Sequence, residues 1–323
     1  MTRALLAAAL CAVVALDAAP ATAQAYPVRP VKIVIPFAPG GATDSMARII
    51  SEQLGTALGQ PILIESRGGA GGGVGSKFVA EAEPDGYTLL MSPAGGLTTG
   101  PVINPGIGYD PARAFAPIAE LIESPLVFEV NPSLPVHSIA EAVAYAKANP
   151  GKLKFGSQGF GTAPHLLIEL FRLETKTDIV LVPYRGTGPL LNAMLGGEVQ
   201  ITADPSTTSL PYIEAGKLRA IAIGGTSRTP PLPNVPTVVE AGFPYLVSPF
   251  WLAVVAPAKT PPAIIAKLNA AFRTALAGAE TRKRLDALGA EVRIGTPEDL
   301  AKMLAAERAK WSEVVKRADL KLQ

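Results

Sequence analysis

Two glycine-rich segments, residues 36–44 (PFAPGGATD) and 156–165 (GSQGFGTAPH), carry the residue types that bind small anions. Each follows an apolar stretch that predicts a strand and precedes a stretch that predicts a helix. The first N–H groups of a helix are unpaired and lie at its positive end, and glycine lets an anion approach them. Thr43 or Asp44 is expected to cap the first helix, and Thr162 the second. Each segment alone is an ordinary helix start, whereas the pair predicts two anion-binding loops.

Catalytic and metal-binding residues are not predicted. Ser157, His165 and Asp204 could form a triad, but Ser157 does not lie in a G-x-S-x-G elbow, and a polar residue such as His165 is ordinary in a first helical turn. The chain has two histidines, His137 and His165, which are far apart in the sequence, and one cysteine, Cys11. No metal site is therefore expected.

Nucleotide cofactors are also not expected. The segment 68–77 (GGAGGGVGSK) matches neither G-x-G-x-x-G nor a P-loop, because Ser76 precedes Lys77. It predicts either a tight loop that opens a helix at 75–82 or part of the wall of a cleft. A net charge of +2 argues against nucleic acid as the main partner.

The N-terminal segment, residues 1–25, is typical of a signal peptide. Arg3 precedes a short apolar core at 4–16, and small residues allow cleavage after Ala23 or Ala25. A buried N-terminal helix is the alternative. Cleavage would leave a mature chain without cysteine, which suits the periplasm. We therefore expect export to the periplasm after cleavage near Ala23–Ala25.

The rest of the chain alternates between predicted strands and helices, which indicates an α/β fold with partly parallel sheets covered on both faces. The expected strands are 31–37, 61–66, 87–92, 126–130, 152–157, 179–184, 199–204, 218–224 and 250–257. The longest expected helices are 43–58, one from Ser138 to Asn149–Pro150, 261–277, and 296–318 with Thr296 as its cap. The rhythm predicts two lobes around a cleft: residues 26–125 and 248–323 form the first, and 126–247 the second.

Several motifs, in this order, resemble the Bug-type extracytoplasmic receptors of tripartite tricarboxylate transporters: YPVRPVKIVIPFAPGGATDSMAR, ESRGGAGGGVGS, PDGYTLL, GSQGFGTAPHLLIELF, VPYRGTGPLL, GKLRAIAI, LPNVPTVVEAGFP and ExxKW (Glu307 to Trp311). The resemblance runs from Tyr26 to about Arg317. It implies a two-lobed periplasmic binding protein of type II that closes on a small carboxylate and is not an enzyme. The loop Phe37–Asp44 would hold a carboxylate through backbone N–H groups and waters, and the loop Ser157–Thr162 would contribute from the second lobe.

The sequence departs from the family pattern at Ser66, Phe160, Leu181 and Asn192. Phe160 is expected either to favour an aromatic or apolar ligand body or to be a surface or lobe-packing residue. Asp44 is expected to tie its loop by capping the helix. It is not expected to contact a ligand carboxylate directly, because like charges repel.

The complete set of expected ligand-binding residues is Phe37, Ala38, Pro39, Gly40, Gly41, Thr43, Asp44, Ser92, Pro93, Ala94, Ser157, Gln158, Gly159, Phe160, Gly161, Thr162, Ala163, His165, Tyr184, Asp204 and Phe250. The resemblance implies a monomer that delivers its ligand to integral-membrane permease subunits. A sensor without a transport role, and an α/β hydrolase, remain the alternatives. An amino acid, a citrate-like acid and an aromatic acid all remain possible ligands.

Overall fold

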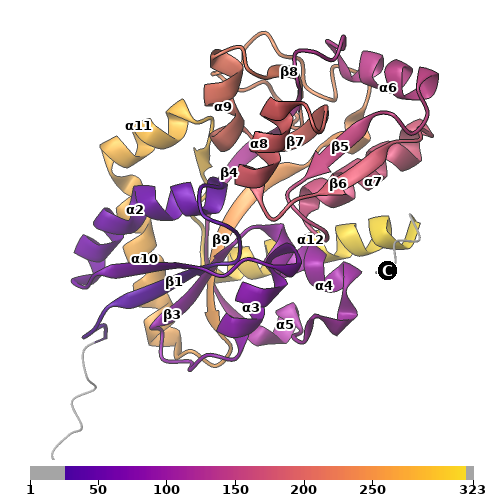
Figure 1. Ribbon diagram of the computed structural model, residues 1–323. Helices are drawn as coiled ribbons and strands as arrows, with labels where there is room; N and C mark the ends of the chain where they lie inside the picture. Colours follow the sequence, from indigo (N-terminus) through magenta and orange to yellow (C-terminus); the bar gives the residue numbers. More distant parts are fainter. Residues whose placement is uncertain (1–25, 318–323) are drawn as a thin grey trace, which may run out of the picture.

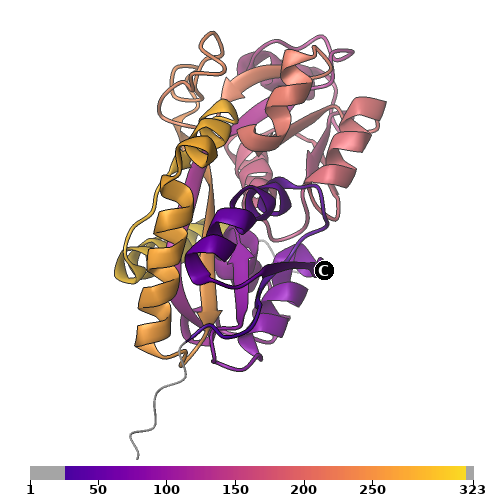
Figure 2. The same ribbon diagram turned by 90° about the vertical axis from the view of Figure 1, so that its left-hand side faces the viewer.

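The computed structural model describes residues 26–317, so the expected signal peptide and its cleavage site lie outside the described residues. The chain folds into two α/β lobes (Figures 1 and 2). Lobe one contains the indigo and violet N-terminal segments together with the orange segment, and lobe two contains the magenta to salmon middle of the chain (Figure 1). No helix within 26–317 is both long enough and apolar enough to span a membrane.

Lobe one is built from segments far apart in the sequence. Its strands are β1 (Val31–Ile35), β2 (Ile62–Ser66), β3 (Thr88–Ser92), β9 (Pro249–Pro257) and β10 (Glu291–Val292). Its helices are α2 (Ala42–Leu58), α3 (Gly73–Ala80), α4 (Gly100–Ile103), α5 (Pro111–Ala114), α10 (Pro262–Ala277) and α11 (Ala279–Ala287), with the helical turns η1 (Ala70–Gly72), η2 (Gly95–Thr99) and η3 (Pro105–Ile107).

Lobe two is continuous. Its strands are β5 (Lys154–Ser157), β6 (Val180–Pro183), β7 (Ile201–Pro205) and β8 (Arg219–Ile223). Its helices are α6 (Ile139–Ala148), α7 (Ala163–Thr175), α8 (Thr187–Gly196) and α9 (Ser206–Glu214), followed by the turn η4 (Pro244–Leu246).

A long strand, β4 (Phe115–Val130), passes from lobe one into lobe two. Residues 115–125 of β4 pair antiparallel with β9, and residues 126–130 pair antiparallel with β7 and β8. The sheet order is therefore β2-β1-β3-β9-β4-β7-β5-β6, with β8 and β10 also paired to β4. The sequence predicted only the 126–130 part of β4. Its remaining part was missed because Pro117, Pro125 and two glutamates interrupt the apolar pattern.

The predicted partly parallel sheets are confirmed. β1 pairs parallel with β2 and β3, and β5 pairs parallel with β6 and β7. Parallel strands need crossover connections, which the helices between them supply. The carboxyl ends of parallel strands share an edge, so the loops after β5 and β6 lie at one edge of lobe two. Three antiparallel pairings, β3-β9, β9-β4 and β4-β7, separate β1 from β5, so β1 runs opposite to β5 and its loop leaves lobe one.

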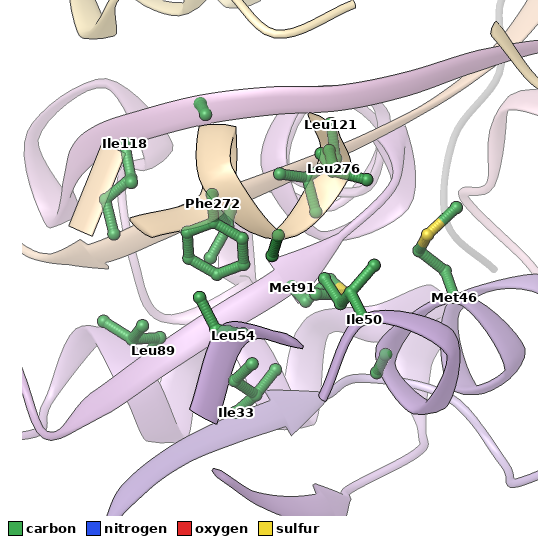
Figure 3. Packing of buried hydrophobic residues seen from close by; sticks show 14 of the residues in the cluster. Ile33, Met46, Ile50, Leu54, Leu89, Met91, Ile118, Leu121, Phe272 and Leu276 are labelled. Carbon is green, nitrogen blue, oxygen red and sulfur yellow. The ribbon is translucent and has the colours of Figure 1, made fainter. Parts of the chain in front are cut away.

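Helices cover both faces of the lobe-one sheet, as expected. On one face, α2 and α10 bury a cluster that includes Ile33, Leu54, Met91 and Phe272 (Figure 3). On the other face, Val34, Leu90 and Val255 pack against a cluster that includes residues of α12 (Pro297–Arg317). Alternate side chains along β1 therefore pack into two separate cores, and this packing fixes the position of the loop that follows β1.

Three of the predicted helix caps are confirmed. Ser138 accepts a hydrogen bond from the N–H of Glu141 (3.1 Å), and Thr162 accepts one from that of His165 (3.4 Å). Thr296 accepts one from the N–H of Asp299 (3.1 Å), whose carboxylate in turn accepts from Thr296. These are capping interactions that satisfy first-turn N–H groups.

The last helix, α12, contacts both lobes. Leu300 and Leu304 belong to the lobe-one cluster. Further along, Trp311 and Val314 pack with residues of α7 in lobe two, and Arg317 forms an ion pair with Glu174 at 2.5 Å. The yellow helix in Figure 1 therefore runs from one lobe onto the other.

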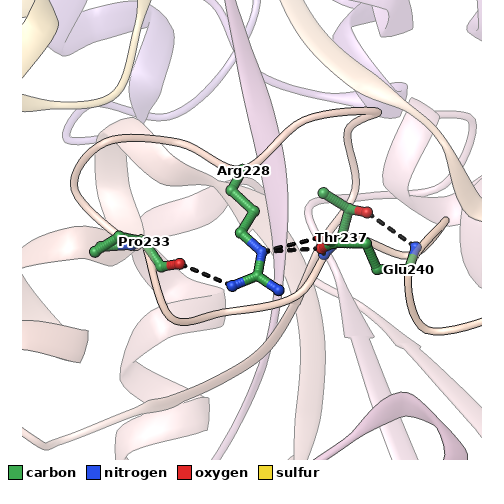
Figure 4. Close-up of polar contacts among 4 residues, drawn as sticks. All are labelled: Arg228, Pro233, Thr237 and Glu240. Carbon is green, nitrogen blue, oxygen red and sulfur yellow. Dashed lines mark hydrogen bonds and ion pairs between the residues drawn. The ribbon is translucent and has the colours of Figure 1, made fainter.

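The connection from β8 to β9 is held by one polar cluster (Figure 4). Arg228 Nε donates to both carboxylate oxygens of Glu240 at 3.1 and 3.0 Å, and Arg228 Nη1 donates to the carbonyl of Pro233 at 3.0 Å. The N–H of Thr237 also donates to Glu240 at 2.7 Å. The hydrogen bond from Arg228 is the main reason why the pKa of Glu240 is below its usual value.

Candidate functional site

A pocket lies between the two lobes and encloses about 630 Å³ of space between atoms, its mouth included. Lobe one, lobe two and the connecting strands β4 and β9 all contribute. The lining residues are Phe37, Ala38, Gly41, Ala42, Thr43, Asp44, Pro93, Ala94, Gly95, Leu126, Gln158, Thr162, Ala163, Pro164, Thr187, Pro205, Pro249, Phe250 and Trp251.

Three helices begin at this pocket. They are α2, α7 and α8, whose N-cap residues are Gly41, Thr162 and Gly186. Among the described residues, the first N–H groups of these helices, those of Ala42, Thr43, Ala163 and Thr187, donate no hydrogen bond. Such N–H groups and the dipoles behind them attract anions. The sequence had identified the starts of α2 and α7, but not that of α8.

The start of α2 differs from the prediction. Its N-cap is Gly41, which has no side-chain oxygen to offer, so neither Thr43 nor Asp44 is the cap. The helix begins earlier than expected, which places Asp44 in its first turn. From there Asp44 accepts a hydrogen bond from the N–H of Gly40 at 3.1 Å and pairs with Arg48 at 3.0 Å. Asp44 thus holds the loop through the N–H of Gly40, which is already used, and not as the cap that was predicted.

The charge of Asp44 is retained at the pocket wall. Burial by itself would raise its pKa, but the hydrogen bonds from Arg48 and Gly40 outweigh that effect and hold the pKa below its usual value. The carboxylate is therefore ionised at neutral pH. Because Arg48 and Gly40 occupy it, it leaves the neighbouring N–H groups of α2 free.

The loop before α7 is fixed by its own side chains. The hydroxyl of Thr162 donates to the carbonyl of Gly159 at 2.8 Å, and the N–H of Gly161 donates to His165 Nδ1 at 3.3 Å. His165 is buried, and burial lowers its pKa to about 4, so the ring is neutral at physiological pH. His165 therefore supports the loop rather than supplying positive charge.

Contacts between the lobes surround the pocket. The hydroxyl of Thr99, in η2 of lobe one, donates to the carbonyl of Gly161 in lobe two at 2.6 Å. Gly71 lies directly against the carbonyl of Phe160, and Gly41 lies against Thr187. The segment 68–77 thus forms both the predicted turn before α3 and a surface that meets lobe two.

Phe160 does not line the pocket. Its ring lies 4.4 Å from the His165 ring, centroid to centroid, and it packs with the cluster that contains Trp311. Of the two expectations for this residue, packing between the lobes is the one that the structure supports.

The structure brings roughly half of the expected site residues together. Those that line the pocket are Phe37, Ala38, Gly41, Thr43, Asp44, Pro93, Ala94, Gln158, Thr162, Ala163 and Phe250. The others lie next to the pocket loops or behind them and are not among its lining residues: Pro39, Gly40, Ser92, Ser157, Gly159, Phe160, Gly161, His165, Tyr184 and Asp204.

Sequence reasoning missed eight lining residues: Ala42, Gly95, Leu126, Pro164, Thr187, Pro205, Pro249 and Trp251. Thr187 could have been found, because PYRGTGP has the same glycine-then-helix pattern as the two loops that were identified. Leu126, Pro249 and Trp251 have no such signal in the sequence. They line the pocket only because β4 and β9 pair with each other where the chain crosses between the lobes.

The imagined catalytic triad is not assembled. Within residues 26–317, the hydroxyl of Ser157 has no hydrogen-bond partner, His165 accepts from Gly161, and Asp204 accepts from Gln158, Thr187 and Thr208. Within residues 26–317, no group of three or more potential metal ligands lies close enough to hold an ion.

The pocket combines apolar walls with neutral polar groups. Phe37, Leu126, Phe250 and Trp251 form much of its apolar surface, and none of its lining residues is Lys, Arg or His. An anion in this pocket would therefore have to be bound by hydrogen bonds and helix dipoles rather than by a basic side chain.

Residues 46–320 match the family model described as the tripartite tricarboxylate transporter family receptor. The protein BugT of Bordetella pertussis is 38% identical over 307 residues, which are 95% of this chain and 94% of BugT.

Solved structures agree with this match. The periplasmic binding protein BugD is 34% identical, with a TM-score of 0.88 over 92% of this chain and all of that chain. MatC from Rhodopseudomonas palustris, solved with bound malate, is 37% identical, with a TM-score of 0.86 over 90% of this chain and all of that chain. The two-lobed α/β architecture is thus that of the type II periplasmic binding proteins. This chain belongs to the tripartite tricarboxylate transporter receptor family, whose members are periplasmic solute-binding receptors and not enzymes.

Proposed function

We propose that this receptor captures a small organic carboxylate by closing its lobes and delivers it to a tripartite tricarboxylate-type permease in the membrane. The observation that carries the proposal is the convergence of three helix N-termini on one pocket between the lobes. MatC, with malate bound, supports the choice of a carboxylate.

In this proposal, the N–H groups of Ala42 and Thr43 hold one carboxylate of the ligand, and those of Ala163 and Thr187 approach it from lobe two. The apolar walls contact its carbon skeleton. Charge-assisted hydrogen bonds contribute about 1.5–3 kcal/mol each, so two or three, together with burial of the ligand, account for micromolar binding, roughly −8 kcal/mol.

The remaining assignments follow from the same proposal. Residues 26–125 and 248–323 form lobe one, residues 126–247 form lobe two, and the mature protein is a monomer released by cleavage near Ala23–Ala25.

A sensor would use the same pocket. Comparing solute uptake by cells that carry the receptor with uptake by cells that lack it separates a sensor from a transport receptor.

We expect one class of organic acid to raise the melting temperature clearly in a screen of malate, citrate, glutamate and benzoate. A ligand present at 100 times its Kd stabilises the folded state by about 2.7 kcal/mol. Thermal denaturation at pH 7.5 measures the effect, and mass spectrometry shows whether the acid is recovered unchanged.

Neutral amides of the same acids are the matched controls, because they keep the skeleton and lose the charge. If an amide raised the melting temperature as much as its acid does, that result would contradict anion binding. Consumption of the bound acid would instead favour a hydrolase.

A further inference from the structure

Two buried carboxyl groups lie behind the pocket, in lobe two. Glu129 of β4 and Asp204 of β7 are both completely buried. Asp204 pairs with Val127 and Glu129 pairs with Thr202 across the antiparallel strands. Glu129 and Asp204 are therefore diagonal neighbours on the same face of the sheet.

Asp204 is bonded to two residues that line the pocket. Its Oδ1 accepts a hydrogen bond from Gln158 Nε2 and another from the hydroxyl of Thr187 at 3.2 Å, while its Oδ2 accepts from Thr208. Gln158 and Thr187 come from different segments, the loop after β5 and the start of α8. Gln158 Nε2 also donates to the carbonyl of Ala203 at 3.1 Å. The Asp204 carboxyl is therefore the acceptor that the Gln158 and Thr187 side chains share.

In the part of the chain that the structure describes, no positive charge compensates the two acids. Among the described residues, neither forms an ion pair, and both carboxylate oxygens of Glu129 lack a hydrogen-bond partner. The neighbouring elements offer no substitute. Arg219 of β8 donates to the carbonyls of Leu134 and Val136, and His165 of α7 is neutral.

Asp44 lines the pocket from lobe one. It carries a negative charge that is paired with Arg48, so it adds no positive charge beside the two acids. The α9 residues beside the two acids, Thr208 and Ser209, carry no charge.

Burial without a cation favours the protonated form of a carboxyl group. Burial raises the pKa of Asp204 to about 6, although its hydrogen-bond donors act in the opposite direction. The pKa of Glu129 is raised well above its usual value, first by burial and then by the charge of Asp204. The hydrogen bonds from Gln158, Thr187 and Thr208 favour the ionised form of Asp204, whereas the carboxyl oxygens of Glu129 have no such donor among the described residues.

We propose that Asp204 is a positioning residue that couples ligand binding to a proton: it orients Gln158 and Thr187 toward the pocket and takes up a proton when an anion binds there. This inference rests on the proposed function. A ligand carboxylate beside Gln158 and Thr187 adds negative charge close to Asp204. The proton-binding affinity of Asp204 then rises on ligand binding.

The sign of the effect follows from linkage. If the ligand raises the proton affinity of Asp204, protonation of Asp204 must equally favour the ligand. Binding is then tightest below the pKa of the ligand-free protein. It weakens by up to about tenfold per pH unit above that pKa, and becomes constant above the pKa of the complex.

The test uses the acid that binds best among malate, citrate, glutamate and benzoate. Calorimetry between pH 6 and 8, in the cationic buffers bis-Tris and imidazole, measures affinity and proton uptake without a competing buffer anion. We expect the wild-type protein to take up a fraction of one proton per ligand near pH 6.5. Asp204→Asn keeps an acceptor for Gln158 and Thr187 but cannot ionise, so it should bind with no proton uptake from this site.

Glu120→Gln is the matched control. Burial, together with the charge of Glu123, raises the pKa of Glu120 to about 7, yet Glu120 is not among the pocket-lining residues. This variant should keep the proton uptake of the wild-type protein. Asp204→Ala should bind more weakly at every pH, because Gln158 and Thr187 lose their shared acceptor.

A ligand-free measurement completes the test. An acid whose pKa is raised on folding loses stability as pH rises from its unfolded pKa to its folded pKa. The melting temperature of the wild-type protein, relative to Asp204→Asn, should therefore fall between about pH 4 and pH 6. A constant difference would show that Asp204 does not titrate in this range and would overturn the inference.

The possible failures are distinguishable. If none of the four acids binds, both the proposed function and the coupling are wrong. If an acid binds without proton uptake, or if Asp204→Asn retains all of the uptake, only the coupling is wrong. If Asp204→Ala binds as tightly as the wild-type protein, the positioning role is wrong.

Discussion

Replacing Gly41 with valine is expected to abolish measurable ligand binding, with a loss of more than about 100-fold, equivalent to two charge-assisted hydrogen bonds. Gly41 has φ −88°, so its backbone tolerates a side chain. A Cβ there would lie 3.7 Å from the Cβ of Thr187, at ordinary contact distance. The methyl groups of valine extend beyond that Cβ and would fill the space between the starts of α2 and α8.

Two matched variants make this result specific. Gly41→Ala adds only the Cβ that fits, so it should reduce affinity far less than valine does. Arg185→Gln removes an exposed cation near the start of α8 that is not among the pocket-lining residues, and should also have a small effect. Isothermal calorimetry decides the matter. Loss of binding in Arg185→Gln, with retention in Gly41→Val, would show that a salt bridge holds the ligand rather than the backbone.

Replacing Gly71 with alanine is expected to weaken binding at least about tenfold, by keeping the lobes apart. Gly71 has φ +61°, and an added Cβ would overlap the carbonyl oxygen of Phe160 in the opposite lobe. A backbone carbonyl cannot rotate away as a side chain can, so the whole lobe must move. The closed state therefore loses stability. Ligand affinity falls with it, because affinity depends on the population of the closed state.

Gly59→Ala controls for the cost of the backbone conformation. Gly59 has φ +70°, yet no atom lies within 4 Å of its added Cβ. Both variants place alanine in the left-handed region, which costs about 1–2 kcal/mol, but only one of them obstructs the opposite lobe. Calorimetry should show weaker binding in Gly71→Ala alone. Small-angle scattering should show ligand-induced compaction in Gly59→Ala and not in Gly71→Ala. Equal affinities in the two variants would mean that closure does not require this contact.

The sequence by itself determined the local elements and the two loops that begin α2 and α7. Apolar runs predicted most of the strands, although not β10 or most of β4, and short-range capping by Ser138, Thr162 and Thr296 predicted helix starts. These features depend on neighbouring residues, so they can be recognised without the fold. The same is true of the family resemblance, because its motifs are contiguous.

Only the tertiary structure decided which residues share the pocket. Leu126 and Trp251 line it because β4 and β9 cross between the lobes side by side, and this pairing joins residues more than 120 positions apart. Asp204 was expected to bind the ligand, yet it lies behind Gln158 and Thr187. Phe160 was a candidate for contacting the ligand, yet it packs on His165. Sequence patterns report which face of an element is apolar, whereas the depth of a side chain behind a pocket depends on how distant elements pack.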